Sequence, residues 1–541
     1  MGYVQEYDYV IIGAGSAGCV LANRLSANPL VRVLLLEAGG KDTNPWIHVP
    51  IGYARTIYNK STSWIYETEP CEGTGGRPGR WPRGKVLGGS SSINGLVYIR
   101  GQAADYDHWR QLGNDGWGYQ DVLPAFKKSQ NQTGDTASFD PNYHNTDGPL
   151  AVSDLGMQDE LAEAMIASAG ESGIPRTDDF NGADQEGVGY FQLTTRNGRR
   201  CSAAVAYLNP VKKRDNLTII THALVGKIRC KDKIARSVVY QKNGQIHEAS
   251  ASQEIILSGG AINSPQLLML SGIGSAVQSK KHDIEVVHDL PGVGQNLQDH
   301  FQVRTIHSTH RPITANDQLR RLDRKVLNGL KYAFFKTGML TVGAGQVGVF
   351  TRTKQGLAGP DIQMHYVPFA ANLMGDDLLP FSAFALSVCQ LRPESSGTIT
   401  LASNDPTQHP VIQPNYMATD LDRQTMIDGV REIRRIVSHE PIKSLIKEEY
   451  LPGPEVNSDD EILDFVKQYG STIFHPSCTC KMGPSEDKMA VVDAQLRVHG
   501  IARLRVADAS IMPSVVSGNT NAACIMIGEK AAEMILEGNA G

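Results

Sequence analysis

The chain has 541 residues, of which 41% are hydrophobic and 20% charged, and its formal net charge is −5. This composition is typical of a globular protein of at least two domains and excludes disordered and fibrous classes. The acidic balance argues against nucleic acid as a partner. No run of about 18 apolar residues could span a bilayer, and we expect no secretory signal. The scattered cysteines predict no metal site and a reducing cytoplasm.

The first predicted element is a short apolar strand over residues 7–12, followed by a GxGxxG loop and a helix. In this loop Gly13 permits the tight turn, Gly15 leaves room for a pyrophosphate, and Gly18 lets the helix pack closely on the strand. The helix N-terminus supplies N–H groups and a positive dipole. A second strand, 33–36, ends at an acid suited to ribose hydroxyls. We predict a dinucleotide site formed by Gly13, Gly15, Ser16, Ala17, Gly18, Glu37 and Ala38.

A second glycine-rich block covers residues 83–95, with the sequence RGKVLGGSSSING. Its small residues and hydroxyls indicate a loop whose backbone meets a pyrophosphate or the edge of an isoalloxazine ring. NAD-binding folds have no need of such a loop so soon after the first βαβ unit. Residues 284–297 contain a further GxG, but Leu297 stands where a third glycine belongs, so we interpret them as a turn. One dinucleotide site and this second loop favour resident FAD over NAD.

Four motifs in order resemble the glucose–methanol–choline (GMC) oxidoreductase family. Residues 83–107 are similar to its first signature and residues 259–274 to its second. Residues 475–483 (HPSCTCKMG) and 518–521 (GNTN) resemble its C-terminal active-site motifs. The likeness runs through the chain and is closest to bacterial choline dehydrogenase-like and aliphatic alcohol dehydrogenases. It implies bound FAD, an α/β Rossmann-like FAD-binding domain and an α+β substrate domain with an antiparallel sheet.

The cofactor motifs lie at both ends of the chain, so we expect a discontinuous FAD-binding domain. We assign it residues 1–155, 200–308 and 467–541. Residues 156–199 and 309–466 then form the substrate-binding domain. A strand is predicted over residues 361–368 of this domain and a helix over residues 420–438, with the helices of the domain on one face of its sheet.

The resemblance assigns catalysis to His475 and Asn519. His475 is expected to take the proton of the alcohol, for which its ordinary pKa near 6.5 is suitable at neutral pH. Loss of that proton promotes hydride transfer from the carbinol carbon to flavin N5. The amide of Asn519 donates a hydrogen bond but does not titrate, so we expect one titrating catalytic histidine. His300 is interpreted as structural.

The resemblance also implies further FAD contacts. Val225 is expected to reach the adenine through its backbone, and Asp508 to lie near the ribityl and pyrophosphate groups. Asn94 is expected at the C4a/N5 edge of the flavin, with a turn residue beside a glycine as the alternative. Ile93 stands where some choline oxidases carry a histidine that tethers the flavin, so we expect non-covalent FAD. The other predicted contacts are Arg83, Gly88, Gly89, Ser91, Gly95, Asn519 and Thr520.

The expected reaction is oxidation of a primary alcohol to its aldehyde, with electrons passed to a quinone, a redox protein or another acceptor. One alternative is an alcohol oxidase that uses O₂ and forms H₂O₂. A second is a hydroxynitrile lyase, because some members of the superfamily keep FAD without its redox chemistry. Choline would need an aromatic or acidic cage for its quaternary ammonium, and an uncharged alcohol is at least as good a candidate.

Residues 320–336 interleave six basic side chains with apolar ones. The pattern is typical of a surface helix that packs its apolar face on its own domain. It is also compatible with a basic amphipathic helix that docks on anionic lipid near a membrane quinone. We favour the first interpretation. The expected location is therefore the cytoplasm, with peripheral contact at the inner face of the membrane as the alternative.

Overall fold

The computed structural model describes residues 5–134, 139–372 and 376–538. Its first seven-stranded sheet has the order β10-β2-β1-β13-β12-β11, with β24 paired to β13. The parallel strands are β1 (Gln5–Ile12), β2 (Val33–Leu36), β10 (Leu217–Ile220), β13 (Gln245–Leu257) and β24 (Leu504–Val506); β11 (Leu224–Lys231) and β12 (Ile234–Lys242) extend the sheet antiparallel. All of β2 is buried, as expected for a parallel strand covered on both faces. The predicted Rossmann-like domain is confirmed.

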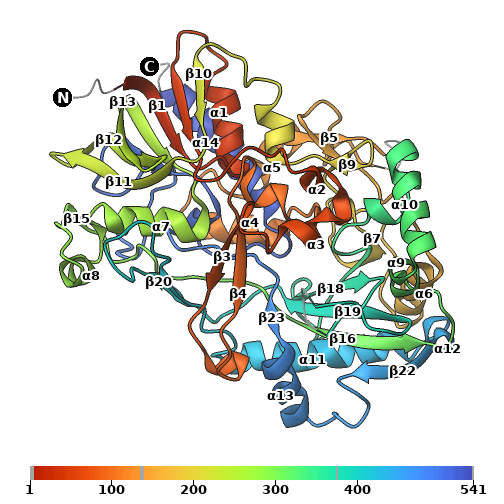
Figure 1. Ribbon diagram of the computed structural model, residues 1–541. Coiled ribbons are helices and arrows are strands. Elements are labelled where there is room, and N and C mark those ends of the chain that lie inside the picture. Colours follow the sequence, from red (N-terminus) through yellow and green to blue (C-terminus); the bar gives the residue numbers. More distant parts are fainter. Residues whose placement is uncertain (1–4, 135–138, 373–375, 539–541) are drawn as a thin grey trace.

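Helices from opposite ends of the chain pack together beside this sheet (Figure 1). They are α1 (Ser16–Leu25) and α14 (Asn521–Gly538), and α5 (Tyr119–Ser129) packs against α14. A Cβ added at Gly528 would lie 3.0 Å from the Cα of Ala17, so the two helices approach closely. This contact explains why cofactor motifs occur at both ends of the sequence.

The second seven-stranded sheet has the order β22-β16-β19-β18-β17-β7, with β23 paired to β16. Its strands are β7 (Gly187–Tyr190), β16 (Phe301–Thr309), β17 (Val347–Thr351), β18 (Ile362–Val367), β19 (Ala383–Gln390), β22 (Ile446–Leu451) and β23 (Ser471–Thr472), all antiparallel. Helices α6 (Glu160–Glu171), α11 (Asp420–Val437) and α13 (Asp459–Tyr469) pack on it. The predicted antiparallel sheet, its strand near 361–368 and its helix near 420–438 are confirmed.

The second sheet includes residues that the predicted division gives to the FAD-binding domain. Strand β16 begins at Phe301 and β23 lies at 471–472, whereas the predicted boundaries fall at 308 and 467. Those boundaries follow the positions of motifs. Membership of the sheet depends instead on the register of β16 with β19, which pairs Gln302 with Cys389 and cannot be read from local sequence.

The remaining α-helices and β-strands belong to neither seven-stranded sheet. They are α2 (Pro45–His48), α3 (Tyr53–Thr56), β3 (Ser63–Glu67), β4 (Arg80–Gly84), α4 (Ala103–Gln111), β5 (Gln130–Gln132), β6 (Leu150–Val152), β8 (Thr195–Arg196), β9 (Arg199–Arg200), α7 (Gly260–Leu270), β14 (Ile273–Gly274), α8 (Ala276–Lys281), β15 (His288–Asp289), α9 (Ala315–Arg320), α10 (Leu322–Phe335), β20 (Thr398–Thr400), β21 (Val411–Gln413) and α12 (Ile442–Leu445). Within the described ranges, no helix combines the length and apolar composition that crossing a bilayer requires.

Helix α10 leaves its apolar face exposed. Leu322 is 77% exposed, Val326 55%, Leu330 51% and Phe334 76%, and these residues repeat every fourth position. Tyr332 is the buried residue of the helix and lies on the opposite side. The prediction that this helix packs its apolar face on its own domain is therefore wrong. In Figure 1 the helix stands at the edge of the molecule.

A buried ion pair fastens α1 to α14 and generates a stability prediction. The fully buried carboxylate of Glu529 accepts two hydrogen bonds from Arg24, at 2.6 and 2.9 Å, and one from the Tyr207 hydroxyl at 3.0 Å. Arg24→Met removes the two short hydrogen bonds of this carboxylate and leaves it the Tyr207 hydroxyl and the half-exposed Lys128, whose Nζ is 3.5 Å away, so we expect the free energy of unfolding to fall by about 3 kcal/mol. The double variant Arg24→Met/Glu529→Leu should recover most of the loss. The free energy of unfolding is measured by chemical denaturation of the holoenzyme. If the single and the double variant lost the same amount, the pairing would be contradicted.

Candidate active site

Two adjoining cavities lie where the two sheets meet. The first cavity follows the carboxyl ends of β1, β2 and β13, the edge at which open α/β sheets bind ligands. The second cavity lies over one face of the antiparallel sheet, at β16, β18 and β19. Both cavities are lined by Ser16, Arg83, Ser90, Thr520 and Cys524. The two cavities therefore form one continuous site.

The glycines of the first loop differ in what requires them. A Cβ on Gly13, whose φ is +99°, would lie 2.4 Å from the Ser258 carbonyl oxygen. A Cβ on Gly18 would lie 1.9 Å from the Gly13 oxygen. For Gly15 the nearest protein atom would be 3.7 Å away, an ordinary contact, and the residue faces the first cavity. Protein packing thus requires Gly13 and Gly18, whereas Gly15, which has no side chain, leaves space in the cavity for a ligand.

The second glycine loop is stacked on the first. A Cβ on Gly89 would lie 2.7 Å from the Gly15 Cα. Ser91 turns away from the cavities, because its hydroxyl donates to the Gly88 oxygen at 2.6 Å and accepts from the Ala203 N–H at 2.9 Å. Gly88 and Ser91 are absent from the lining, so their contact with FAD stays a prediction. Ser90, which sequence reasoning did not single out, lines both cavities.

Glu37 holds the first loop and also faces the cavity. Its two carboxylate oxygens accept the N–H groups of Ala14, at 2.9 Å, and Gly39, at 2.8 Å. Burial raises the pKa of Glu37 to about 7. Each carboxylate oxygen retains a second lone pair, which leaves capacity for ribose hydroxyls. The backbone contacts were not predicted from the sequence.

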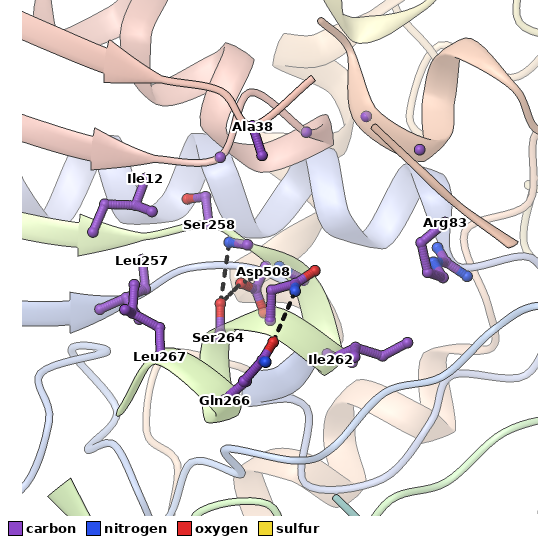
Figure 2. Close-up of a pocket in the computed structure, with 18 of the residues that line it drawn as sticks. Ile12, Ala38, Arg83, Leu257, Ser258, Ile262, Ser264, Gln266, Leu267 and Asp508 are labelled. Carbon is purple, nitrogen blue, oxygen red and sulfur yellow. Dashed lines mark hydrogen bonds between the residues drawn. The ribbon is translucent and has the colours of Figure 1, made fainter. Parts of the chain in front are cut away.

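Asp508 fixes the N-terminus of α7 at the cavity wall (Figure 2). One carboxylate oxygen accepts from the Gly260 N–H at 2.8 Å and from the Ser264 hydroxyl at 2.6 Å. The other accepts from the Ser510 N–H at 2.8 Å. Burial raises the pKa of Asp508. Residues 258–264 line the same wall, and the second signature is the sequence signal that could have identified them.

The other predicted contacts divide between the two cavities. Ala17, Ala38 and Val225 line the first cavity, and Asn94, Gly95 and Asn519 line the second. Asn94 accepts a hydrogen bond from the buried guanidinium of Arg200 at 2.6 Å, a partner that the sequence did not reveal. Ile93 also lines the second cavity. Among the described residues, no group of three or more His, Cys, Asp or Glu side chains could hold a metal ion.

His475 is held by its backbone at the junction of the two sheets. It follows β23, and the preceding Phe474 has a left-handed φ of +68°. The His475 N–H donates to a carboxylate oxygen of Asp299 at 2.8 Å. The carbonyl of Phe474 accepts from Arg83 at 2.6 Å. The imidazole is thereby fixed at the wall of the second cavity.

A second histidine determines which nitrogen of His475 carries the proton. His300 Nδ1 lies 2.9 Å from His475 Nδ1, and His300 Nε2 lies 3.2 Å from the Leu391 carbonyl oxygen. A carbonyl only accepts, so His300 Nε2 is protonated and its Nδ1 accepts from His475 Nδ1–H. In a neutral His475, Nε2 then carries the lone pair. His300 therefore contacts the predicted base, a role that the structural interpretation did not include.

Burial keeps both imidazoles neutral. It lowers the pKa of His300 to about 4 and that of His475 well below the ordinary value, and in His475 the neighbouring His300, His365 and Arg83 act in the same direction. The expectation of an ordinary pKa for His475 is therefore corrected. A neutral imidazole with its lone pair on Nε2 is ready to accept a proton at pH 7.

The amide of Asn519 lies opposite that lone pair. Its Oδ1 accepts from Gln363 Nε2 at 3.1 Å, which turns Nδ2 toward His475 Nε2, 3.4 Å away. One donor and one acceptor thus converge at the second cavity, as a substrate hydroxyl requires. Gln363, on β18, was missed by sequence reasoning because only its fold position brings it to Asn519.

The two cavities together fit FAD. The first offers backbone amides, the N-terminus of α1 and two acids for a dinucleotide. The second offers a proton acceptor beside a hydrogen-bond donor for the substrate. This arrangement suits a cofactor that accepts a hydride from a carbinol carbon.

Comparisons with known proteins agree with this geometry. The GMC oxidoreductase models match residues 7–302 and 393–528. An alcohol dehydrogenase [acceptor] of Pseudomonas putida is 45% identical over 98% of this chain and 96% of its own. Mitochondrial choline dehydrogenase of Mus musculus is 46% identical over 98% of this chain and 89% of its own. The crystal structure of pyridoxine 4-oxidase from Mesorbium loti is 31% identical in sequence and has a TM-score of 0.87. The match covers 97% of this chain and 98% of that one. The chain belongs to the GMC oxidoreductase family and is an FAD-dependent enzyme, with non-covalent cofactor, that oxidises CH–OH groups.

Proposed function

We propose that the enzyme oxidises a primary alcohol to its aldehyde and passes the electrons to a quinone or another acceptor. The observation that carries the proposal is the convergence of His475 Nε2 and Asn519 Nδ2 at the second cavity. The name of the related Pseudomonas putida enzyme, alcohol dehydrogenase [acceptor], supports an electron acceptor of this kind.

The roles of the two side chains follow from their hydrogen-bonding capacity. The substrate oxygen accepts from Asn519 Nδ2–H and gives its proton to His475 Nε2. Negative charge then develops on the oxygen, and the amide N–H stabilises it. Bound FAD supplies the acceptor for the hydride of the carbinol carbon. The imidazole thus takes the proton of the alcohol, and the amide holds the alcohol oxygen in place.

The lining of the second cavity argues against choline. None of its residues is Asp or Glu, and its aromatic residues are Tyr53 and Phe474, apart from the histidines. A quaternary ammonium would meet the guanidinium of Arg304 instead of a cage of aromatic or acidic groups. About half of the other lining side chains are apolar, including Ile93, Leu96 and Val367, which favours an alkyl or aryl chain on the alcohol.

The two alternatives predict different products. An oxidase would form H₂O₂ in air, as the name of the related pyridoxine 4-oxidase leads one to consider. Turnover with a quinone and little peroxide supports the proposed dehydrogenase. A hydroxynitrile lyase would leave the flavin oxidised when alcohols are added without oxygen, so anaerobic bleaching excludes it.

The division of roles gives a prediction for variants. His475→Ala removes the proton acceptor, so we expect anaerobic flavin reduction to slow by about 100-fold or more. Asn519→Ala removes one neutral hydrogen bond and should slow it by about 10-fold. Stopped-flow absorbance with a saturating primary alcohol measures both rates. Equal losses in the two variants would contradict the proposed roles.

The lowered pKa of His475 gives a pH prediction. The imidazole must be neutral to act, so reduction needs a pH above its pKa. Since burial places that pKa well below the ordinary value, the rate should stay level through the neutral range and fall only below about pH 6.5. Asn519 does not titrate, so one acid limb is expected. An acid limb at or above pH 7 would overturn this assignment.

We further propose that α10 rests on an anionic membrane. The exposed stripe defined by Leu322, Val326, Leu330 and Phe334 faces away from the protein. Residues 315–336 carry six basic and two acidic side chains, a net charge of +4, although the whole chain carries −5. The Tyr332 hydroxyl donates to the Gly198 oxygen at 3.1 Å, so the hairpin β8–β9 with its arginines lies beside the helix. An apolar stripe with flanking cations suits anionic lipid.

This placement would bring a quinone close to the site. Helix α10 packs against the short turn at Met339–Thr341, and Ala344, three residues further, lines the second cavity. A lipid surface under α10 would therefore lie near the wall of the substrate cavity. A lipid-dissolved acceptor and an apolar alcohol would both be concentrated there.

Vesicle binding tests the membrane contact. We expect the enzyme to sediment with vesicles of phosphatidylglycerol and phosphatidylcholine, less so in high salt, and weakly with phosphatidylcholine alone. Leu330→Gln/Phe334→Gln should weaken binding by about 10-fold or more. The matched control is Leu30→Gln/Val277→Gln, at sites 86% and 80% exposed. Equal binding by all variants would contradict the proposal. A dimer that the first variant abolishes would instead assign the stripe to a second copy.

A further inference from the structure

The antiparallel sheet presents a row of polar side chains to the substrate cavity. Gln302 and Arg304 are two residues apart on β16 and therefore share a face. The register places Arg304 opposite Ser387 of β19, and Ser387 opposite His365 of β18. All three of these residues line the second cavity. The row crosses the cavity floor and is not used by the proton transfer described above.

Arg304 has no partner within the described structure. It forms no ion pair or hydrogen bond there, and its Nε is buried and unpaired. The buried Arg200, by contrast, donates to the carbonyl oxygens of Ile47 and Ser91 and to Asn94. Burial of a guanidinium without partners is unfavourable. Arg304 thus offers unused donors to the cavity.

The surroundings of Arg304 lack any compensating negative charge. The groups that raise its pKa against the effect of burial are the phenols of Tyr53 and Tyr58. Burial raises the pKa of both phenols, to about 12 for Tyr53, so they stay neutral. No acid lines the cavity. An anionic ligand would supply the counter-charge that these residues do not provide.

His365 adds a second unused group beside Arg304. Its Nε2 is buried without a partner, and Nδ1 lies 3.5 Å from the Ser387 hydroxyl. Burial, together with the charge of Arg304 and with His300, lowers the pKa of His365 to about 3, so the ring is neutral. With Ser387 as donor to Nδ1, Nε2 carries the proton and becomes a further donor. The donors along this row suit an anion.

We propose, on the basis of the alcohol oxidation inferred for this cavity, that Arg304 binds a carboxylate carried by the substrate away from its carbinol carbon. A guanidinium matches a carboxylate with two parallel hydrogen bonds. The enzyme therefore prefers hydroxy acids to neutral alcohols of equal length.

The register limits how far apart the two ends of the substrate lie. Gln363, which orients Asn519, is opposite Cys389, and His365 is opposite Ser387. The Arg304 row is thus one repeat, about 7 Å, along the strands from the row that supports the proton transfer. A chain of several carbon atoms between hydroxyl and carboxylate spans that separation.

Matched substrate pairs test the proposal. Anaerobic flavin reduction is measured with 4-hydroxybutyrate against 1-butanol and with 6-hydroxyhexanoate against 1-hexanol. In the wild-type holoenzyme we expect the hydroxy acid of at least one pair to have a kcat/KM about 10-fold higher or more. Arg304→Gln should abolish that preference, mainly by raising KM for the hydroxy acid. It should change kcat/KM for the alcohol by less than about threefold. Arg304→Lys keeps the positive charge but cannot form two parallel hydrogen bonds, so its preference for hydroxy acids should be intermediate.

Two controls separate this role from others. Lys280→Gln removes an exposed positive charge outside the cavity and should leave the preference unchanged. Hexanoate, which has no hydroxyl, should inhibit wild-type alcohol oxidation competitively and more strongly than hexanamide. This second measurement does not depend on the folding of a variant.

The outcomes also distinguish this proposal from the proposed function. Alcohols that reduce the flavin better than every matched hydroxy acid would overturn the role of Arg304 and leave alcohol oxidation intact. Equal losses for acids and alcohols in Arg304→Gln would assign Arg304 to the reaction in general. If neither class reduces the flavin, alcohol oxidation itself is wrong.

Discussion

The hydrogen bond between His300 and His475 is the interaction on which the chemistry of this site depends. It places a proton on His475 Nδ1 and so leaves the lone pair of Nε2 at the substrate cavity. The direction of the bond is set by the Leu391 carbonyl, which lies directly after β19 and accepts from the other nitrogen of His300. The backbone at the end of the antiparallel sheet therefore selects the tautomer of the proposed base. The adjacent Asp299 holds the His475 backbone, so two consecutive residues fix both the ring and the chain that carries it.

The cofactor loops and the base belong to different sheets, and their alignment depends on contacts that join distant parts of the sequence. Arg83, from the strand before the second glycine loop, donates to the carbonyl that precedes His475. Ser16, at the start of α1, donates to Asn521 at the start of α14, at 2.8 Å. Asn519, two residues earlier, contacts His475. A short series of hydrogen bonds therefore connects the dinucleotide loop to the proposed catalytic pair.

The sequence predicted the features that depend on local chain geometry. Gly13, Gly18 and Glu37 are required by a turn, a helix contact and a strand end, and each requirement has a fixed spacing. The antiparallel sheet came from resemblance, and the fold confirms it. What could not be predicted depends on partners far along the chain. His300 meets a residue 175 positions away, and β16 joins its sheet through register with β19. For α10 the spacing indicates an amphipathic helix, but the choice of inward face follows from Tyr332 and its contact with Gly198.

Negative and positive side chains lie in different parts of the site. This separation explains how a weakly basic imidazole can act as the proposed base. The acids Glu37 and Asp508 lie on the first cavity, where a dinucleotide offers hydroxyls. At the reacting end of the second cavity, Arg83 donates to the carbonyl that precedes His475, and no acid lines the cavity. Positive charge at the reacting end stabilises the substrate oxygen as it becomes negative, and a low dielectric strengthens this effect. Burial lowers the pKa of His475, and His300, His365 and the charge of Arg83 act in the same direction. A field that makes the base weaker therefore also makes the hydroxyl a stronger acid, and the two changes offset each other in the proton transfer.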